Sequence, residues 1–381
     1  MNVGELVAVM QRIAPLRYAE SWDRAGLQVG SSDAQITGVV LLTIDLSEQV
    51  LDEAIEQGAS AIIAYHCPIW EPLASLTDGT PKERVVRRAI ENGIAIFSPH
   101  TALDSAPGGV TDWLCEGISG GSPGTIAGDC RALEPHHTVE RGQQMKVVVF
   151  VPEAEADALR NAMATAGAGT IGSYRLVSFA APGTGTFFGA EGAAPVVGKA
   201  GRLERVAEVR LEMVCSRAAL PLVERTLAEF HPYETPAYDV YELFGTHERE
   251  AGLGRRLVLD QPVTTDQIAR RLAKHLGTTR VKYALAGDDE PVRQIGVIPG
   301  SGEDLADLAA SEGCHVFVTG EMRHHAVVRA LEQGLSIVLG GHTNTERGYL
   351  PRLGERMKAL APELNPVVSR CDCDRFHMVK A

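Results

Sequence analysis

Hydrophobic residues in the first 120 positions follow two alternating patterns. Some segments repeat apolar residues at the three-to-four spacing of an amphipathic helix, and others are short continuous apolar runs, typical of strands buried on both faces. The predicted helices are 2–14, 47–58 and 81–93, and the predicted strands are 36–45, 59–66 and 94–100. Because strands and helices alternate, we predict parallel βα units with helices on both faces of a sheet.

The pattern changes near residue 117. Segment 117–129 is rich in Gly and Ser and is interpreted as a loop or linker. Further along the chain, the predicted strands are 145–152, 173–187, 207–215 and 236–243, with helices at 153–167 and 217–230. This order predicts a compact α+β, ferredoxin-like module of roughly 100 residues.

After about residue 250 the βα pattern returns. The predicted strands are 292–300, 314–320 and 335–341, and the largely helical segments are 303–313, 326–334 and 346–360. We therefore predict an α/β protein whose core domain is split into two parts, 1–125 and 247–381, by a module inserted at 143–246.

An internal repeat supports two related halves. VVRRAIENGIAIFSPHTALD, which ends at Asp104, and VVRALEQGLSIVLGGHTNTE, which ends at Glu346, both give a helix, a Gly and a strand. Each then ends in His-Thr-x-x-acid, so that His100 and Asp104 in one half match His342 and Glu346 in the other. We infer that the two halves face one another.

Composition and charge narrow the class of protein. A hydrophobic content of 45% and a charged content of 22% exclude wholesale disorder. A net charge of −13 argues against direct nucleic-acid binding, which needs Lys and Arg to replace counterions. We see no signal peptide and no apolar run of the roughly 18 residues that a membrane span needs. Seven scattered cysteines predict no disulfide framework, so we expect a cytoplasmic protein.

Chemically active side chains of the core stand where predicted strands end. They are Asp45, His66, His100, Asp104, Glu321, His324, His325, His342 and Glu346. Ligands of open α/β sheets bind outside the carboxyl ends of the strands, so one crevice could gather these groups. Imidazoles and carboxylates suit Zn, Mn, Fe, Co or Ni. Together they are enough for a two-metal centre with a bridging carboxylate, of the kind that activates water for hydrolysis.

Particular roles follow from type and spacing. We predict that Asp104, His342 and Glu346 are metal ligands, because a spacing of four places His342 and Glu346 on one face of a helical turn. His100 either ligates metal itself or holds Asp104 in place. Cys67 is a ligand or a nucleophile by type, but beside a proline in a strand-end turn it is interpreted as a packing residue.

The remaining candidates are less specific. His324 and His325 follow a Gly-Glu-Met turn, where they could bind an anionic substrate, act as acid–base groups near pH 7, or simply be solvated at a helix N-terminus. Cys371 and Cys373 form a C-x-C pair, which supplies only two of the four ligands of a closed zinc site. The sequence contains no P-loop, no G-x-S-x-G and no dinucleotide fingerprint.

Several stretches in combination resemble a known family. They are WDRAGLQVG (22–30), YHCPIW (65–70), SPHTALDSAPGGVTDWL (98–114), TGEMRHH (319–325) and GGHTNTERG (340–348). These resemble the NGG-interacting-factor-three-like family, whose bacterial members are named GTP cyclohydrolase 1 type 2 homologues. GTGTFFGAEGAAPVVG (183–198) and HPYETPAYDVYEL (231–243) resemble the PII/CutA-like module inserted in many bacterial members. The resemblance covers nearly the whole chain.

The resemblance implies two divalent metal ions per chain, held at His66, Asp104, His342 and Glu346. Many members have two adjacent histidines at the first motif, whereas this chain has Tyr65 in the first of those places, as in the eukaryotic branch. Tyr65 could ligate through its phenolate, the second metal could bind weakly, or a water could substitute. The resemblance also implies toroidal homohexamers built from dimers, with metal sites facing an internal cavity.

These observations give one leading hypothesis and two rivals. The leading hypothesis is a dinuclear metal-dependent hydrolase acting on a nucleotide or similar small anion, in which activated water attacks the purine imidazole carbon. His324 or His325 would position the anion or transfer a proton, and Arg347 would neutralise phosphate. The first rival is non-catalytic metal storage, delivery or sensing, or a regulatory scaffold. The weaker rival is a transcriptional or interaction role.

Overall fold

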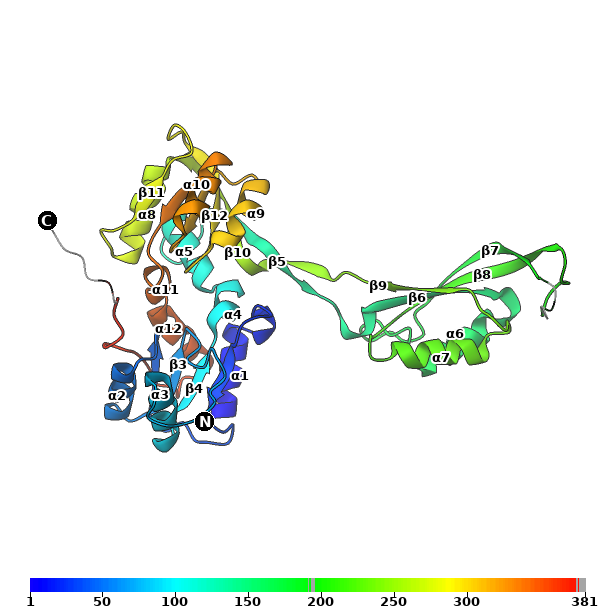
Figure 1. Ribbon diagram of the computed structural model, residues 1–381, viewed down its shortest axis with the longest axis horizontal. Coiled ribbons are helices and arrows are strands. Elements are labelled where there is room, and N and C mark those ends of the chain that lie inside the picture. The colour runs from blue at the N-terminus through cyan, green and yellow to red at the C-terminus, as the bar shows by residue number, and fades with distance from the viewer. Residues whose placement is uncertain (191, 193–195, 375, 377–381) are drawn as a thin grey trace. The chain divides into compact units, whose positions relative to one another are not determined.

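The computed structural model describes residues 1–190, 192, 196–374 and 376. It divides into two compact units. The core unit comprises Met1–His136 and Glu248–Ala381, and the inserted unit comprises His137–His247. Figure 1 labels many of their helices and strands, which form a mixed α/β fold with several sheets. No helix in the described ranges has the length and apolar character needed to cross a membrane.

The first sheet of the core unit has the strand order β1-β4-β3-β2-β15. Its strands are β1 (Gly26–Val29), β2 (Val39–Thr43), β3 (Ala59–Ala64), β4 (Ala95–Ser98) and β15 (Pro366–Val368). The parallel pairing of β2, β3 and β4 confirms the predicted βα units. The sequence pattern missed the antiparallel edge strand β1 and the C-terminal strand β15, which pairs in parallel with β2.

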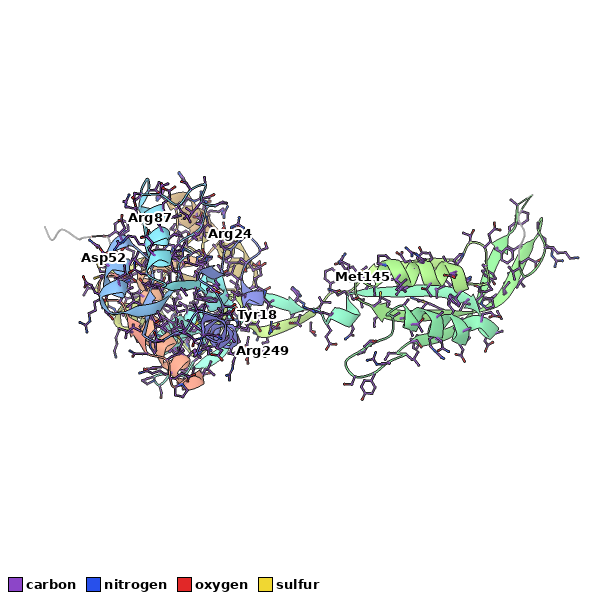
Figure 2. The ribbon with its side chains drawn as sticks, turned by 90° about the horizontal axis from the view of Figure 1, so that it is seen from below. Tyr18, Arg24, Asp52, Arg87, Met145 and Arg249 are labelled. Carbon is purple, nitrogen blue, oxygen red and sulfur yellow. The ribbon has the colours of Figure 1, made fainter. Side chains whose placement is uncertain are left out.

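Helices cover both faces of this sheet. One face packs against α2 (Glu48–Glu56) and α3 (Pro81–Glu91). The other packs against α1 (Val3–Ile13) and α12 (Leu350–Leu360). Ion pairs of Arg84 with Glu48 and of Arg88 with Asp52 join α3 to α2; Figure 2 labels Asp52 and Arg87 on these helices.

The second sheet has the order β11-β14-β13-β12-β10-β5. Its strands are β5 (Gly128–Thr138), β10 (Thr246–Val263), β11 (Lys282–Ala284), β12 (Val292–Val297), β13 (Val316–Thr319) and β14 (Ser336–Leu339). The helices against it are α5 (Val110–Ser119), α8 (Thr265–Leu276), α9 (Ala306–Ser311) and α10 (His324–Glu332). One hydrophobic cluster contains buried residues of both sheets, so the two halves share a single core. The predicted loop at 117–129 is shorter than expected, because α5 continues to Ser119 and β5 begins at Gly128.

The inserted unit is a four-stranded antiparallel sheet with two helices. Its elements are β6 (Met145–Pro152), α6 (Ala156–Thr165), β7 (Phe179–Phe188), β8 (Leu203–Cys215), α7 (Leu220–Phe230) and β9 (Tyr238–Glu242). The strand order is β7-β8-β6-β9, and both helices bury their apolar residues against the sheet. Single-turn 3₁₀ helices are Arg141–Gln143 and Glu153–Glu155 in the inserted unit and Leu16–Tyr18 and Glu303–Leu305 in the core unit.

A buried arginine joins the two halves of the core. Arg255 on β10 is 1% exposed, and its Nε donates to Oδ1 of Asp112 on α5 at 2.5 Å. Its other nitrogens donate to the carbonyl groups of Ser105 and Ala106 and of two glycines in β10. A buried ion pair contributes stability only when its hydrogen bonds are satisfied, as they are here.

We predict that Arg255→Met lowers the free energy of unfolding by about 3–5 kcal/mol, because it leaves the Asp112 carboxylate without its buried partner. Arg256→Met is the matched control. Arg256 is only partly buried and donates from Nε to the carbonyl of Glu312, so its loss should cost less than about 1 kcal/mol. Urea titration followed by circular dichroism measures both. Equal losses in the two variants would contradict the proposed role of Arg255.

Candidate metal centre

The two His-Thr-x-x-acid motifs occupy equivalent places in the two halves. His100 and Asp104 lie on α4 (His100–Ser105), which follows β4. Glu346 lies on α11 (Asn344–Arg347), which follows β14, and His342 lies just before this helix. The second turn brings Nε2 of His342 to 3.4 Å from Oε1 of Glu346, as the spacing predicts. In the first turn, His100 and Asp104 contact other residues instead. Gly300 follows β12 with φ +63°, and a Cβ there would lie 2.7 Å from Oε1 of Glu346, so this backbone leaves room for the carboxylate.

Ligating atoms of His66, His342 and Glu346 lie within 4.8 Å of one another. Nε2 of His66 is 3.6 Å from Oε2 of Glu346, and Nε2 of His342 is 3.4 Å from Oε1. Glu346 is 2% exposed, and its Oε2 has no hydrogen-bond partner. These separations are too long for hydrogen bonds, but nitrogen and oxygen ligands on one tetrahedral zinc ion are about 3.3 Å apart. These three side chains could therefore hold a metal ion.

Further carboxylates orient the two imidazoles. Nδ1 of His66 lies 2.9 Å from Oδ1 of Asp45, and Nδ1 of His342 lies 2.9 Å from Oε1 of Glu321. Such contacts fix the ring orientation of ligating histidines and make the free nitrogen more basic. Asp45 and Glu321 are both strand-end groups in the sequence, but only the structure shows which histidine each one contacts.

Tyr65 and Asp104 form a buried pair beside this cluster. The Tyr65 hydroxyl donates to Oδ1 of Asp104 at 2.5 Å. Burial, with added repulsion from Asp104 and Glu346, raises the pKa of Tyr65 well above its usual value. Burial and the charge of Glu346 also raise the pKa of Asp104, against the hydrogen bond from Tyr65. In the metal-free protein Tyr65 is thus a neutral hydrogen-bond donor rather than a phenolate.

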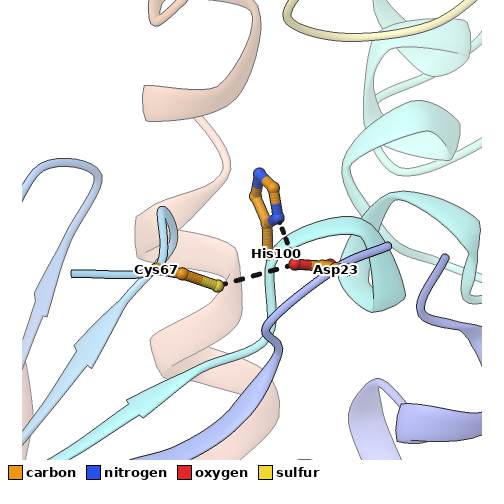
Figure 3. A group of neighbouring side chains, drawn as sticks. All are labelled: Asp23, Cys67 and His100. Atoms are coloured by element: carbon orange, nitrogen blue, oxygen red, sulfur yellow. Dashed lines mark hydrogen bonds and ion pairs between the residues drawn. The ribbon is translucent and has the colours of Figure 1, made fainter. Parts of the chain in front are cut away.

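His100 contacts a residue that sequence reasoning missed. Its Nδ1 lies 2.8 Å from Oδ1 of Asp23. One interpretation of the sequence expected His100 to hold Asp104 in place instead. Contacts with His100 and Thr101 outweigh burial and lower the pKa of Asp23 to about 2. The thiol of Cys67 lies 3.6 Å from the same oxygen, and burial raises its pKa to about 11 (Figure 3). Asp23 stands inside the WDRAG stretch, which was the only sequence signal for it.

The predicted substrate-binding groups lie in different surroundings. His324 and His325 begin α10, are exposed, and have ring centroids 5.5 Å apart. No hydrogen bond between described residues joins either ring to the cluster around Glu346. Nη1 of Arg347 forms an ion pair with Oδ2 of Asp372 at 2.5 Å and donates to its carbonyl at 3.0 Å. Arg347 therefore holds the C-terminal segment, and its contact with phosphate stays a prediction.

We predict that the His66 imidazole in the metal-free protein titrates near pH 10. Burial opposes its charge, but contacts with Asp45 and Glu346 outweigh burial and raise the pKa of His66 to about 10. Asp45→Asn removes one of these anions and should shift the midpoint toward the ordinary value of about 6.5. Glu321→Gln is the control, because Glu321 contacts His342. Histidine NMR of metal-free protein measures the midpoints, and a wild-type midpoint for His66 near 6.5 would contradict this electrostatic description.

Comparisons with known proteins identify the family of this chain. The model of the family Duf34/NIF3 (NGG1p interacting factor 3) matches residues 1–374. The chain is 34% identical to the "GTP cyclohydrolase 1 type 2 homolog" of Halalkalibacterium halodurans, over 99% of each chain. It is 30% identical to "NIF3-like protein 1" of Bos taurus, over 100% of this chain and 93% of the relative. A crystal structure of a Bacillus cereus protein related to NIF3 superimposes with a TM-score of 0.62 at 34% identity, covering 100% of this chain and 99% of the other. The chain belongs to the Duf34/NIF3 family.

Proposed function

We propose that this protein binds two divalent metal ions and is a dinuclear metal-dependent hydrolase of a nucleotide or similar small anion, like a GTP cyclohydrolase 1 type 2. The observation that carries the proposal is the buried Glu346 carboxylate, whose two oxygens face Nε2 atoms of His66 and His342 at 3.6 and 3.4 Å. The names of the bacterial relatives suggest the substrate class.

The donor set assigns residues to each ion. His66, Asp104 and one oxygen of Glu346 would hold the first ion. His342 and the other oxygen of Glu346 would hold the second, with Tyr65 or water completing that side. Nitrogen and carboxylate donors suit Zn, Mn, Fe, Co or Ni. Bound there, a metal pair supplies activated water as the nucleophile.

Other side chains have supporting roles. Asp45 and Glu321 orient the imidazoles of His66 and His342. His324 and His325 lie in the first turn of α10, where exposed backbone N–H groups favour an anion. We propose that these histidines position the anion or transfer a proton. His100 would be a further metal ligand if its Nε2 reaches an ion. Nη1 of Arg347 is paired with Asp372, whereas its buried Nε and Nη2 have no hydrogen-bond partner among the described residues and would be the groups to meet phosphate.

A non-catalytic role in metal storage, delivery or sensing is the second candidate. It needs the same metal ligands but no turnover, and the inserted unit, which the metal ligands do not require, favours it. The inserted unit has the βαββαβ order of ferredoxin-like folds, so we propose a PII/CutA-like regulatory or assembly module. We further propose a cytoplasmic homo-oligomer, a hexamer by family resemblance, that makes no direct contact with nucleic acid.

We predict about two metal ions per chain in protein purified without added metal, and clear losses in Asp104→Asn and Glu346→Gln. Glu346→Gln should lose both ions, because each ion would take a ligand atom from this carboxylate, whereas Asp104→Asn should lose mainly one. Glu48→Gln is the control, since Glu48 is paired with Arg84 at the surface of α2. Mass spectrometry gives the metal content, and formate release from GTP tests hydrolysis.

Metal loss in both variants together with formate release by wild type would support the hydrolase. Metal binding without turnover of any nucleotide would favour storage or sensing. Unchanged metal content in Glu346→Gln would overturn the dinuclear centre itself.

We predict that Tyr65→His tightens binding of the second metal by about tenfold or more, because it adds an imidazole beside His66. Tyr65→Phe is the matched control, since it removes the hydroxyl without adding a nitrogen ligand. Calorimetric titration of metal-free protein measures both. If Tyr65→His binds the second ion no more tightly than Tyr65→Phe, position 65 does not face that ion.

A further inference from the structure

Asp23, Cys67 and His100 form a second cluster, distinct from the group of His66, His342 and Glu346. Asp23 lies before β1, Cys67 follows β3, and His100 opens α4, so three separate segments converge. Their ligating atoms lie within 4.8 Å of one another. Figure 3 shows Sγ of Cys67 and Nδ1 of His100 both directed at Oδ1 of Asp23, at 3.6 and 2.8 Å.

The cluster is closed off from solvent on most sides. The Asp23 side chain is 0% exposed and the His100 side chain 16% exposed, and Cys67 is buried. The rings of Trp22 and Trp70 lie edge-on to His100, with centroids 6.3 and 5.6 Å away. A buried anion is costly unless donors or cations face it. The backbone N–H groups of Arg24 and Thr101 and the Thr101 hydroxyl donate to Asp23 beside His100, and these contacts stabilise the carboxylate as an anionic ligand.

The contacts do not match a catalytic thiol. An activated nucleophile needs its general base within hydrogen-bond reach. Here the carboxylate stands between the thiol and the imidazole, and Sγ of Cys67 instead donates to the Ser98 hydroxyl at 3.2 Å. Ser98 in turn donates to the carbonyl of Tyr65 at 2.8 Å, so it cannot act as a base for the thiol.

We propose that Asp23, Cys67 and His100 bind one thiophilic divalent cation of the Zn²⁺ class, at a site separate from the dinuclear centre. With metal–sulfur bonds of about 2.3 Å and metal–oxygen or –nitrogen bonds of about 2.0 Å, tetrahedral ligands give S···O of about 3.5 Å and N···O of about 3.3 Å. The Cys67–Asp23 separation of 3.6 Å already fits. The His100–Asp23 contact would open by about 0.5 Å as the metal replaces its hydrogen bond.

Charge and ligand type also favour this cation. On binding, the thiol proton passes to solvent, and His100 gives up its Nδ1 proton while Nε2 carries one, so that a neutral imidazole ligates. The resulting thiolate and the Asp23 carboxylate then balance a charge of +2 in a buried place. Thiolate selects softer metals than the imidazole–carboxylate set around Glu346 does. Neighbouring residues of one turn, His66 and Cys67, thus serve two sites with different metal preferences. The site depends on neither Glu346 nor hydrolysis.

Cobalt substitution of the full-length protein tests the site, because a Co²⁺–thiolate bond gives a near-ultraviolet charge-transfer band that nitrogen and oxygen ligands do not. The background is the double variant Cys371→Ser, Cys373→Ser, which removes the exposed C-x-C pair. We expect the band in this background and its loss when Cys67→Ser is added. Adding Cys215→Ser instead, a buried thiol of the inserted unit, should leave the band unchanged.

Two further variants keep the outcome decisive. Asp23→Asn retains the thiol and should weaken Co²⁺ binding at least tenfold, which tests the site even if Cys67→Ser fails to fold. Glu346→Gln should retain the band, because the dinuclear ligand set has no thiol; failure of one site is therefore distinguishable from failure of the other. Absence of the band in the background, or its survival in a folded Cys67→Ser protein, would overturn the proposal.

Discussion

The buried carboxylate of Glu346 is the constraint around which the core is arranged. It is almost fully buried, one of its oxygens lacks a hydrogen-bond partner, and imidazole nitrogens of His66 and His342 face its two sides. An anion in such a place needs cations. The two histidines come from opposite halves of the chain, so any ion held here also joins the halves.

Strands, short helices and core packing together position the side chains around Glu346. Parallel strands end at one edge of each sheet, and the short helices α4 and α11 place an acid one turn after a histidine. Gly300 leaves room for the Glu346 carboxylate, and Arg255 ties the turn after α4 to β10. A hydrophobic cluster shared by both sheets fixes the distance between these edges. Because one hydrophobic core contains residues of both sheets, it sets where the candidate ligands of the two halves lie.

Much of the core could be predicted from periodicity, since long apolar strands and amphipathic helices are local features. The central parallel strands and the α+β order of the inserted unit are examples. The short edge strands β1 and β15 carry no such signal, because pairing with a distant strand creates them. The repeat predicted that His342 and Glu346 lie together. It could not predict the contact of His100 with Asp23, because these residues are 77 positions apart in the sequence. As an arginine beside the motif, Arg347 was predicted to contact phosphate. In the structure it forms an ion pair with the buried Asp372.

Two adjacent clusters with different donor chemistry give this edge of the core unit an unusual density of metal-binding side chains. The central claim is that metal ions lie on both sides of Glu346. Anomalous X-ray scattering from crystals of the metal-loaded protein, recorded at the absorption edge of the bound metal, tests it most directly. We predict two peaks, one against each carboxylate oxygen of Glu346. A map with no peak within bonding distance of Glu346 would contradict the dinuclear centre.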